Sequence, residues 1–139
     1  MKIKIISKRK LWNYLRSFAN KPAIGILFGG ERFDCCDEVL AAFENDQFLG
    51  AVTLSSQGEL MSGQPTIVGL WVSYQHRRKG IGQSLLEAAI RRMIERGLTP
   101  VRLDSISSKA DIMIERLPQD LKKVIKVFSG GPCDSVLDM

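Results

Sequence analysis

One segment, residues 67–96, constrains the fold more than any other part of the chain. It joins a continuous apolar run, residues 67–72, to a basic loop with two glycines and then to an amphipathic stretch. An apolar run of this kind is typical of a strand that is buried on both faces. The helical stripe consists of Ile81, Leu85, Leu86, Ala89, Ile90, Met93 and Ile94. The segment therefore predicts a strand, a loop and a helix in direct succession, within an α/β fold.

The loop between this strand and helix, residues 76–83, has the chemistry of an anion site. The start of a helix leaves backbone N–H groups without partners, and the helix dipole makes that end positive. Gly80 and Gly82 have no Cβ atom, so their backbone can approach a ligand closely. Three cationic side chains add donors for phosphate oxygens: Arg77, Arg78 and Lys79. The loop is therefore interpreted as a phosphate-holding turn.

Two common phosphate motifs do not fit this loop. The P-loop requires Gly-Lys-Ser/Thr at its end, whereas this chain reads Gly80-Ile81-Gly82-Gln83. The dinucleotide fingerprint requires a third glycine where this chain has Leu85. The strand before a dinucleotide fingerprint would also be the first strand of a parallel unit, whereas the strand before this loop follows a hairpin. Neither nucleotide-binding class is supported by the spacing.

Hydrophobic periodicity and turn residues predict the remaining elements. The expected strands are residues 2–7, 37–44, 48–55, 65–73, 101–106 and 124–128. The expected helices are residues 8–20, 83–96 and 109–117, and residues 23–28 fit a short strand or a buried loop. Ser7 is the expected N-cap of the first helix, and Asn45-Asp46-Gln47 is the expected turn of an antiparallel hairpin. The pattern predicts one domain over residues 1–139, with residues 129–139 as a loose tail.

Composition limits the function classes. The 139 residues carry a net charge of +5, a mild excess that would attract an anionic small molecule or a nucleic acid. Three cysteines and a single histidine make a disulfide framework or a structural zinc site a poor interpretation, so free thiols are expected. No apolar run is long enough to cross a membrane, and no signal peptide is recognised. The cytoplasm is the expected compartment.

A third motif matches the loop. The pattern Arg/Gln-x-x-Gly-x-Gly/Ala after an apolar strand and before an amphipathic helix is the acetyl-CoA motif of the GNAT N-acetyltransferase superfamily. Arg77-Arg78-Lys79-Gly80-Ile81-Gly82 agrees with it at every specified position. Leu70-Trp71-Val72 resembles the fourth strand of that family, and the segment from Gln83 to Ile90 resembles its third helix. The resemblance is strongest over residues 67–106.

The resemblance implies a particular fold. Family members have a twisted mixed β-sheet flanked by helices, and their fourth and fifth strands splay apart at a bulge. Members finish with two further strands over the acceptor site, whereas this chain has material for only one, within residues 122–128. A shortened C-terminal part would leave the acceptor site open, or completed by a second subunit in a homodimer.

The resemblance also implies the activity and the residues that bind acetyl-CoA. The reaction would be direct attack of a primary amine on the thioester, with the acetyl group passing from acetyl-CoA to a small-molecule or protein amine. Backbone groups of Leu70 and Val72 would hold the pantetheine arm, and the N–H near Val72 would polarise the thioester carbonyl. Ser107 or Ser108 takes the place of an asparagine near the pantetheine. The implied cofactor-binding residues are Leu70, Val72, Arg77, Arg78, Lys79, Gly80, Gly82, Gln83 and Ser107.

The catalytic side chains of the family are not evident in this chain. Residues 108–116 contain no tyrosine to protonate the CoA thiolate, and residues 64–72 contain no carboxylate to act as base. Tyr74 and Glu44 are the candidates that remain, and a water chain would also serve as the base. Further candidates, each with a structural or exposed alternative, are His76, Asp104 and Glu38. The acidic residues Glu31, Asp34, Asp37 and Glu38 form either an amine-attracting cluster or a solvated loop.

Two other functions compete with the enzyme. A non-catalytic acyl-CoA-binding or sensing module would explain the missing catalytic side chains. A nucleic-acid-binding protein would use the basic surface, but no aromatic interleaving or recognition-helix pattern accompanies Lys8-Arg9-Lys10. The sequence favours the enzyme first, the sensor second and the nucleic-acid-binding protein last.

Overall fold

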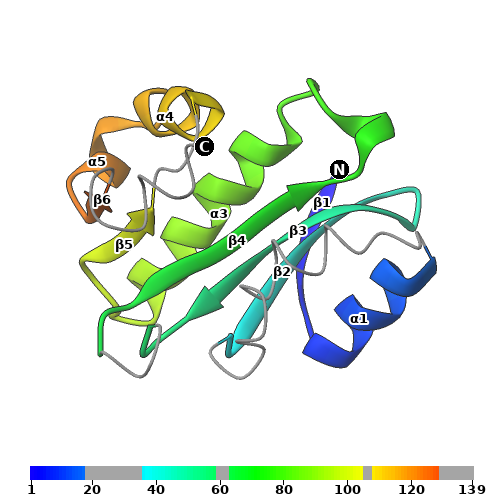
Figure 1. Ribbon diagram of the computed structural model, residues 1–139, viewed down its shortest axis with the longest axis horizontal. Helices are drawn as coiled ribbons and strands as arrows, with labels where there is room; N and C mark the ends of the chain where they lie inside the picture. Colours follow the sequence, from blue (N-terminus) through cyan, green and yellow to red (C-terminus); the bar gives the residue numbers. More distant parts are fainter. Residues whose placement is uncertain (18–35, 59–62, 105–107, 129–139) are drawn as a thin grey trace.

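The computed structural model describes residues 1–17, 36–58, 63–104 and 108–128, and a six-stranded sheet forms its centre (Figure 1). The strands lie in the sheet in chain order: β1 (Lys2–Ile6), β2 (Glu38–Glu44), β3 (Gln47–Ser55), β4 (Thr66–Val72), β5 (Val101–Asp104) and β6 (Ile125–Phe128). The first four strands pair antiparallel, whereas β4 with β5 and β5 with β6 pair parallel. The expectation of a mixed sheet is confirmed.

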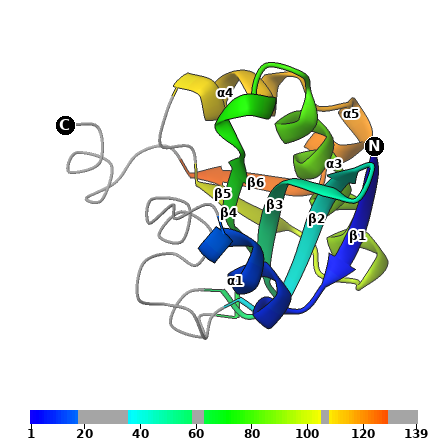
Figure 2. The ribbon, with the colours of Figure 1, turned by 90° about the vertical axis from the view of Figure 1, so that its right-hand side faces the viewer.

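Helices cover both faces of this sheet (Figure 2). On one face lies α1 (Lys8–Ser17), whose first turn is capped because the Ser7 hydroxyl accepts from the Lys10 N–H at 3.1 Å. The other face is covered by α3 (Ile81–Glu95), α4 (Ser108–Glu115) and α5 (Gln119–Lys122). In the described part of the chain, no helix is long and apolar enough to span a membrane.

The larger core lies between α3 and the sheet. The predicted apolar stripe of α3 is buried against strand residues such as Leu49, Val52 and Leu54, which are almost fully inaccessible. Ile94 is the exception: it lies at the end of the helix and is 41% exposed, so its inclusion in the stripe was wrong. Gly97 ends the helix in the left-handed conformation (φ 70°) expected of a C-terminal cap. Burial of this stripe fixes α3, and with it the preceding loop, against β4.

A second core lies under α1 and is largely aromatic. Leu11 and Leu15 of α1 are fully buried against the sheet. Tyr14 stacks on Phe48 with ring centroids 4.9 Å apart, and Phe48 packs near Trp71 of β4 at 6.2 Å. This core holds β2, β3 and β4 together from the side opposite α3.

Two irregularities shape the middle of the sheet. Asn45 and Asp46 both have positive φ values, 51° and 65°, so the hairpin closes in two residues and Gln47 already belongs to β3. In β4, Ile67 pairs with Leu54 and Gly69 pairs with Thr53, which leaves Val68 as the extra residue of a β-bulge. This bulge agrees with the expectation for the fourth strand.

Several expected elements differ in detail. The last strand, β6, pairs directly and in parallel with β5, after a crossover through α4 and α5. A short helix that the sequence pattern did not predict, α5, follows Pro118. The expectations for residues 18–20, 23–28 and 105–107, and for the tail 129–139, lie outside the described residues.

Candidate active site

The sheet opens between β4 and β5. These strands share one register pair, Thr66 with Arg102, and the Arg102 N–H donates to the Pro65 carbonyl at 2.7 Å. Beyond this point β4 continues to Val72 without a β5 partner in the described residues. The result is a wedge whose closed end lies at Thr66 and Arg102 and whose open end lies at the loop before α3. This is the splay that the sequence predicts.

The register of β3 and β4 identifies the backbone groups along this wedge. The Ser73 N–H donates to the Leu49 carbonyl at 2.8 Å, so Ser73 directs its N–H toward β3. Because alternate residues of a strand direct their N–H and C=O groups to opposite sides, Leu70 and Val72 direct theirs into the wedge. Buried or half-buried backbone groups require partners. An extended ligand lying along β4 would supply them.

The loop at the open end has a strained backbone. Tyr74–His76 form one 3-10 turn, and Gly80 then adopts a left-handed conformation (φ 78°) immediately before α3. Arg78 also has a positive φ (66°), which is uncommon for a residue with a side chain. Arg78 and Lys79 are both exposed. Strain of this kind is concentrated at ligand-binding sites, and here it accompanies two exposed cationic side chains.

Arg77 takes a different position from its two cationic neighbours. Its Nε donates to the Val72 carbonyl at 3.0 Å, and its guanidinium lies 5.6 Å from the Tyr74 ring centroid. The carbonyl that the sequence assigns to the pantetheine arm therefore has a side-chain partner in this structure. Arg77 links the end of β4 to the loop.

The first turn of α3 borders the wedge on the α4 side. A Cβ atom added at Gly82 would lie 3.5 Å from the Met113 Cε and 3.7 Å from a Val72 methyl, an ordinary contact distance. The Gln83 amide nitrogen donates to the Met113 carbonyl at 3.0 Å, and its Oε1 is buried without a partner in the described residues. A buried acceptor of this kind is usually satisfied by a donor. Sequence periodicity gave no indication of this link between α3 and α4.

Ser73 and His76 close the turn after β4. The Ser73 hydroxyl, which is almost fully buried, lies 2.8 Å from His76 Nδ1. The His76 N–H also donates to the Ser73 carbonyl at 2.9 Å. The sequence singled out His76 but missed Ser73, whose only signal was its position three residues earlier.

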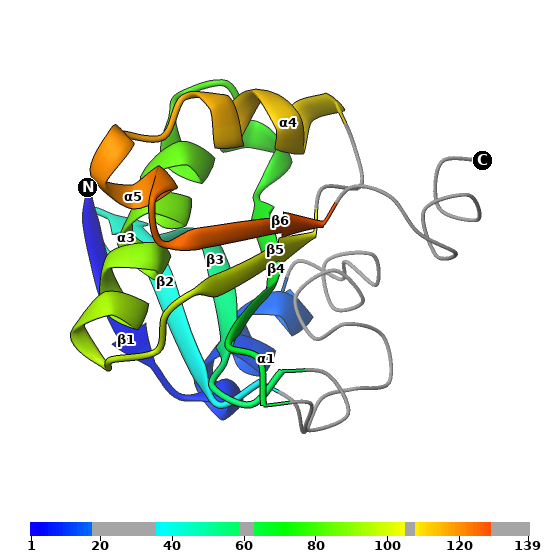
Figure 3. The same cartoon turned by 90° about the vertical axis from the view of Figure 1, so that its left-hand side faces the viewer.

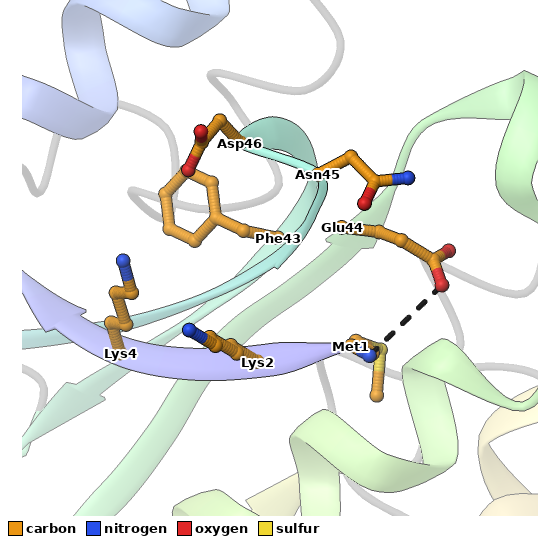
Figure 4. Close-up of a pocket in the computed structure, with 7 residues that line it drawn as sticks. All are labelled: Met1, Lys2, Lys4, Phe43, Glu44, Asn45 and Asp46. Atoms are coloured by element: carbon orange, nitrogen blue, oxygen red, sulfur yellow. Dashed lines mark ion pairs between the residues drawn. The ribbon is translucent and has the colours of Figure 1, made fainter.

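The two catalytic candidates lie in separate places. Tyr74 stands at the open end of the wedge and is 83% exposed. Glu44 ends β2, on the far side of β3 from β4, and its carboxylate lies 4.0 Å from the Met1 amino group (Figure 4). Glu44 belongs to a depression at the hairpin turn lined by Met1, Lys2, Lys4, Phe43, Glu44, Asn45 and Asp46. The structure does not bring Tyr74 and Glu44 together.

The described acidic residues before β2 are held by α3. Glu38 accepts two hydrogen bonds from the Arg92 guanidinium, at 2.7 and 3.0 Å, and Arg96 lies 3.4 Å from Asp37. Burial alone would raise the pKa of Asp37, but hydrogen bonds from Ser56 and Arg96 outweigh it, so this pKa lies below its ordinary value. The Glu38 carboxylate fastens β2 to α3, whereas Asp37 stands exposed just before β2 and pairs with Arg96 at the end of α3. Among the described residues, no cluster of His, Cys, Asp and Glu could hold a metal ion.

A splayed β4 and β5, a bulge in β4 and a glycine loop that leads into the following helix agree with the fold of an N-acyltransferase that uses acyl-CoA. Residues 9–112 match the acetyltransferase (GNAT) family. The chain therefore belongs to the GNAT family and is an acetyl-CoA-dependent N-acetyltransferase. A search of curated proteins gave no match. The family assignment supports the enzyme and favours neither the sensor nor the nucleic-acid-binding protein.

Solved structures show the same fold at low sequence identity. GCN5 from Tetrahymena has a TM-score of 0.58 and 16% identity, with 94% of this chain and 92% of that chain covered. Aminoglycoside N-acetyltransferase AAC(6')-Iy, in complex with CoA, has a TM-score of 0.57 and 18% identity, with 95% of each chain covered. Ribosomal-protein-alanine N-acetyltransferase from Brucella melitensis biovar Abortus 2308 has a TM-score of 0.53 and 22% identity, with 88% and 85% covered.

Proposed function

We propose that this enzyme holds acetyl-CoA in the wedge between β4 and β5 and transfers its acetyl group to a primary amine there. The observation that carries this proposal is the single register pair between these strands, next to the glycine loop that begins α3. A wedge with unpaired strand backbone on one side suits the extended, amide-containing pantetheine arm. The phosphates would lie at the helix N-terminus.

Each part of the wedge would have its own role. The backbone N–H groups of residues 78–83, with the exposed Arg78 and Lys79, would bind the pyrophosphate. The backbone groups of Leu70 and Val72 would hold the arm, with Arg77 moving away from the Val72 carbonyl that it now binds, and one N–H would stabilise negative charge on the thioester oxygen. Gln83 Oε1, a buried acceptor, would receive a donor from the bound molecule. Ser107, outside the described residues, stays a prediction as the last contact.

Catalysis would come chiefly from positioning and charge stabilisation. The neutral amine attacks the acetyl carbon, the C–S bond breaks, CoA leaves as the thiolate, and the amine proton passes to water. The exposure of Tyr74 and its contact with Arg77 favour a supporting role in the loop. The ion pair of Glu44 with Met1 gives no support to a catalytic role. Replacement Tyr74→Phe tests this directly, because a proton donor would be lost while the ring remains.

Thermal unfolding with and without acetyl-CoA tests the proposed site. A ligand at 100 times its Kd stabilises a protein by about 2.7 kcal/mol, a clear upward shift of Tm. Gly82→Glu should abolish this shift, because a longer, negatively charged side chain in the first turn of α3 would repel phosphates at the helix N-terminus, while its Cβ would make only ordinary contacts. Gly82→Ala is the matched control and should retain it. A wild-type protein that neither acetyl-CoA nor CoA stabilises would refute the site.

The compartment and the assembly are further parts of the proposal. The free, buried thiol of Cys36 suits a reducing compartment such as the cytoplasm. A homodimer would complete the acceptor side, where β6 is the last strand of the described sheet. Sedimentation at several protein concentrations would detect this dimer.

A further inference from the structure

One face of β5 and β6 presents a compact group of charged and aromatic side chains. Val101 and Leu103 of β5 are buried in the core beneath α3, so the alternating residues Arg102 and Asp104 lie on the opposite face. The parallel register places Lys126 beside Arg102 and Phe128 beside Asp104. Figure 3 shows β5 and β6 side by side, with α4 and α5 on one side of them. The face opposite these helices therefore carries the group of four.

The side chains in this group are ordered by one another. The Arg102 guanidinium lies 4.0 Å from the Phe128 ring centroid, and its Nε lies 3.1 Å from Asp104 Oδ1. Arg102 and Asp104 nevertheless remain 38% and 41% exposed. No hydrogen bond among the described residues uses the two terminal nitrogens of Arg102. A stacked guanidinium with its terminal nitrogens available is suited to forked binding of a carboxylate.

The position of this group relates it to the reaction. The wedge is closed at the Thr66–Arg102 pair, and Asp104 follows two residues later along β5. A molecule whose phosphates lie beside the glycine loop would extend from that loop along β4, so its thioester would lie between Val72 and the Thr66–Arg102 pair. Arg102 and Asp104 therefore border the side from which an amine would approach.

We propose that the acceptor is a small amine that also bears a carboxylate, such as a free amino acid. Asp104 would bind the ammonium group, because a carboxylate has acceptor sites left after one hydrogen bond to Arg102. The terminal nitrogens of Arg102, together with Lys126, would bind the carboxylate. Two cations against one anion make the face unfavourable for a polyamine. After loss of a proton to water, the amine forms the N–C bond as the C–S bond breaks.

The proposed substrate class rests on the proposed acetyl transfer. A panel of matched acceptors distinguishes a failure of the substrate class from a failure of the acetyl transfer. The full chain is assayed for CoA thiol release with amino acids, with the carboxamides made from them, and with spermidine. Each acid should exceed its carboxamide about tenfold in kcat/KM, the scale of one charge-assisted hydrogen bond. Arg102→Gln should remove this preference through KM, and Lys126→Gln should reduce it. Arg91→Gln, on the exposed side of α3 in an ion pair with Asp120, should leave it unchanged.

Binding measurements keep the test independent of turnover. Calorimetric titration of the CoA complex should give tighter binding for the acids than for the carboxamides, and the difference should vanish in Arg102→Gln. Equal values for acid and carboxamide, or a preference for spermidine, would overturn the proposed substrate class. Failure of both acetyl-CoA and CoA to stabilise the protein would instead refute the proposed function itself.

Discussion

The two edges of β4 differ sharply. Toward β3, six register pairs run from Ser55–Thr66 to Gly50–Val72, whereas toward β5 there is only the pair of Thr66 with Arg102. Backbone groups inside a protein are usually paired. The edge of β4 that faces β5 is an exception, which suits the binding of a ligand. The comparison shows that one strand has an edge paired along its whole length and an opposite edge that leaves an opening in which a ligand can take the missing strand's place.

The largest predicted effect tests the edge of β4 that pairs with β3. A Cβ atom at Gly50 would lie 2.5 Å from the Trp71 carbonyl oxygen and 2.9 Å from the Val72 Cα. Both are backbone atoms that cannot yield unless β4 moves, so Gly50→Ala should reduce the free energy of unfolding by about 3 kcal/mol. Urea denaturation measures the loss. Gly82→Ala, at the start of α3, should change the free energy of unfolding by less than about 1 kcal/mol. Equal losses in the two variants would contradict the difference between the two edges of β4.

The next effect concerns the buried thiol of Cys36, which lies just before β2. Burial raises the pKa of Cys36 to about 11, and the thiol donates to the Glu38 carbonyl at 3.4 Å, which also favours the protonated form. The folded state thus keeps the proton that the unfolded state releases above about pH 9. Stability should fall by up to about 3 kcal/mol as the pH rises from 9 to 11. Cys36→Ala should lose this part of the pH dependence, and an identical curve would refute the assignment.

Deletion of Val68 tests the edge of β4 that faces β5. Val68 is the extra residue of the β4 bulge, and without it Ile67 and Leu70 would keep their common face in an unbroken strand. A straighter β4 should pair further with β5 and close the wedge. Deletion of Val68 should weaken acetyl-CoA binding about tenfold, which is about 1.4 kcal/mol. Calorimetry measures this loss, and Val68→Ala, which keeps the bulge, should bind like the wild type.

The smallest effect lies at the start of β2. Because hydrogen bonds from Ser56 and Arg96 lower the pKa of Asp37, the ionised form stabilises the folded protein. This contribution is complete above the ordinary pKa near 4 and is lost as the pH falls through the lowered value. Asp37→Asn should therefore flatten the decline of Tm below about pH 4. The same Tm difference at every pH would exclude this linkage.

Local patterns in the sequence predicted most of the fold. The glycine loop and the stripe of α3 follow from periodicity and turn chemistry, as do the β2–β3 hairpin and the N-cap at Ser7. The bulge was expected only from the resemblance to the GNAT family, because residues 67–72 form a continuous apolar run whose pattern does not mark Val68 as the extra residue.

Long-range partners could not be predicted in this way. Arg92 and Glu38 are 54 residues apart, and nothing in local periodicity joins them. The parallel pairing of β6 with β5 depends on how α4 and α5 return the chain to the sheet, not on the four residues of β6. The stack of Arg102 on Phe128 likewise exists only because those strands are neighbours.

The outer strands bear on how this protein behaves at high concentration. A sheet margin with unpaired backbone invites strand addition by another chain and hence aggregation. Here one margin, β1, carries Lys2 and Lys4, and the other, β6, has only four residues including Lys126. Charge and short length discourage such association.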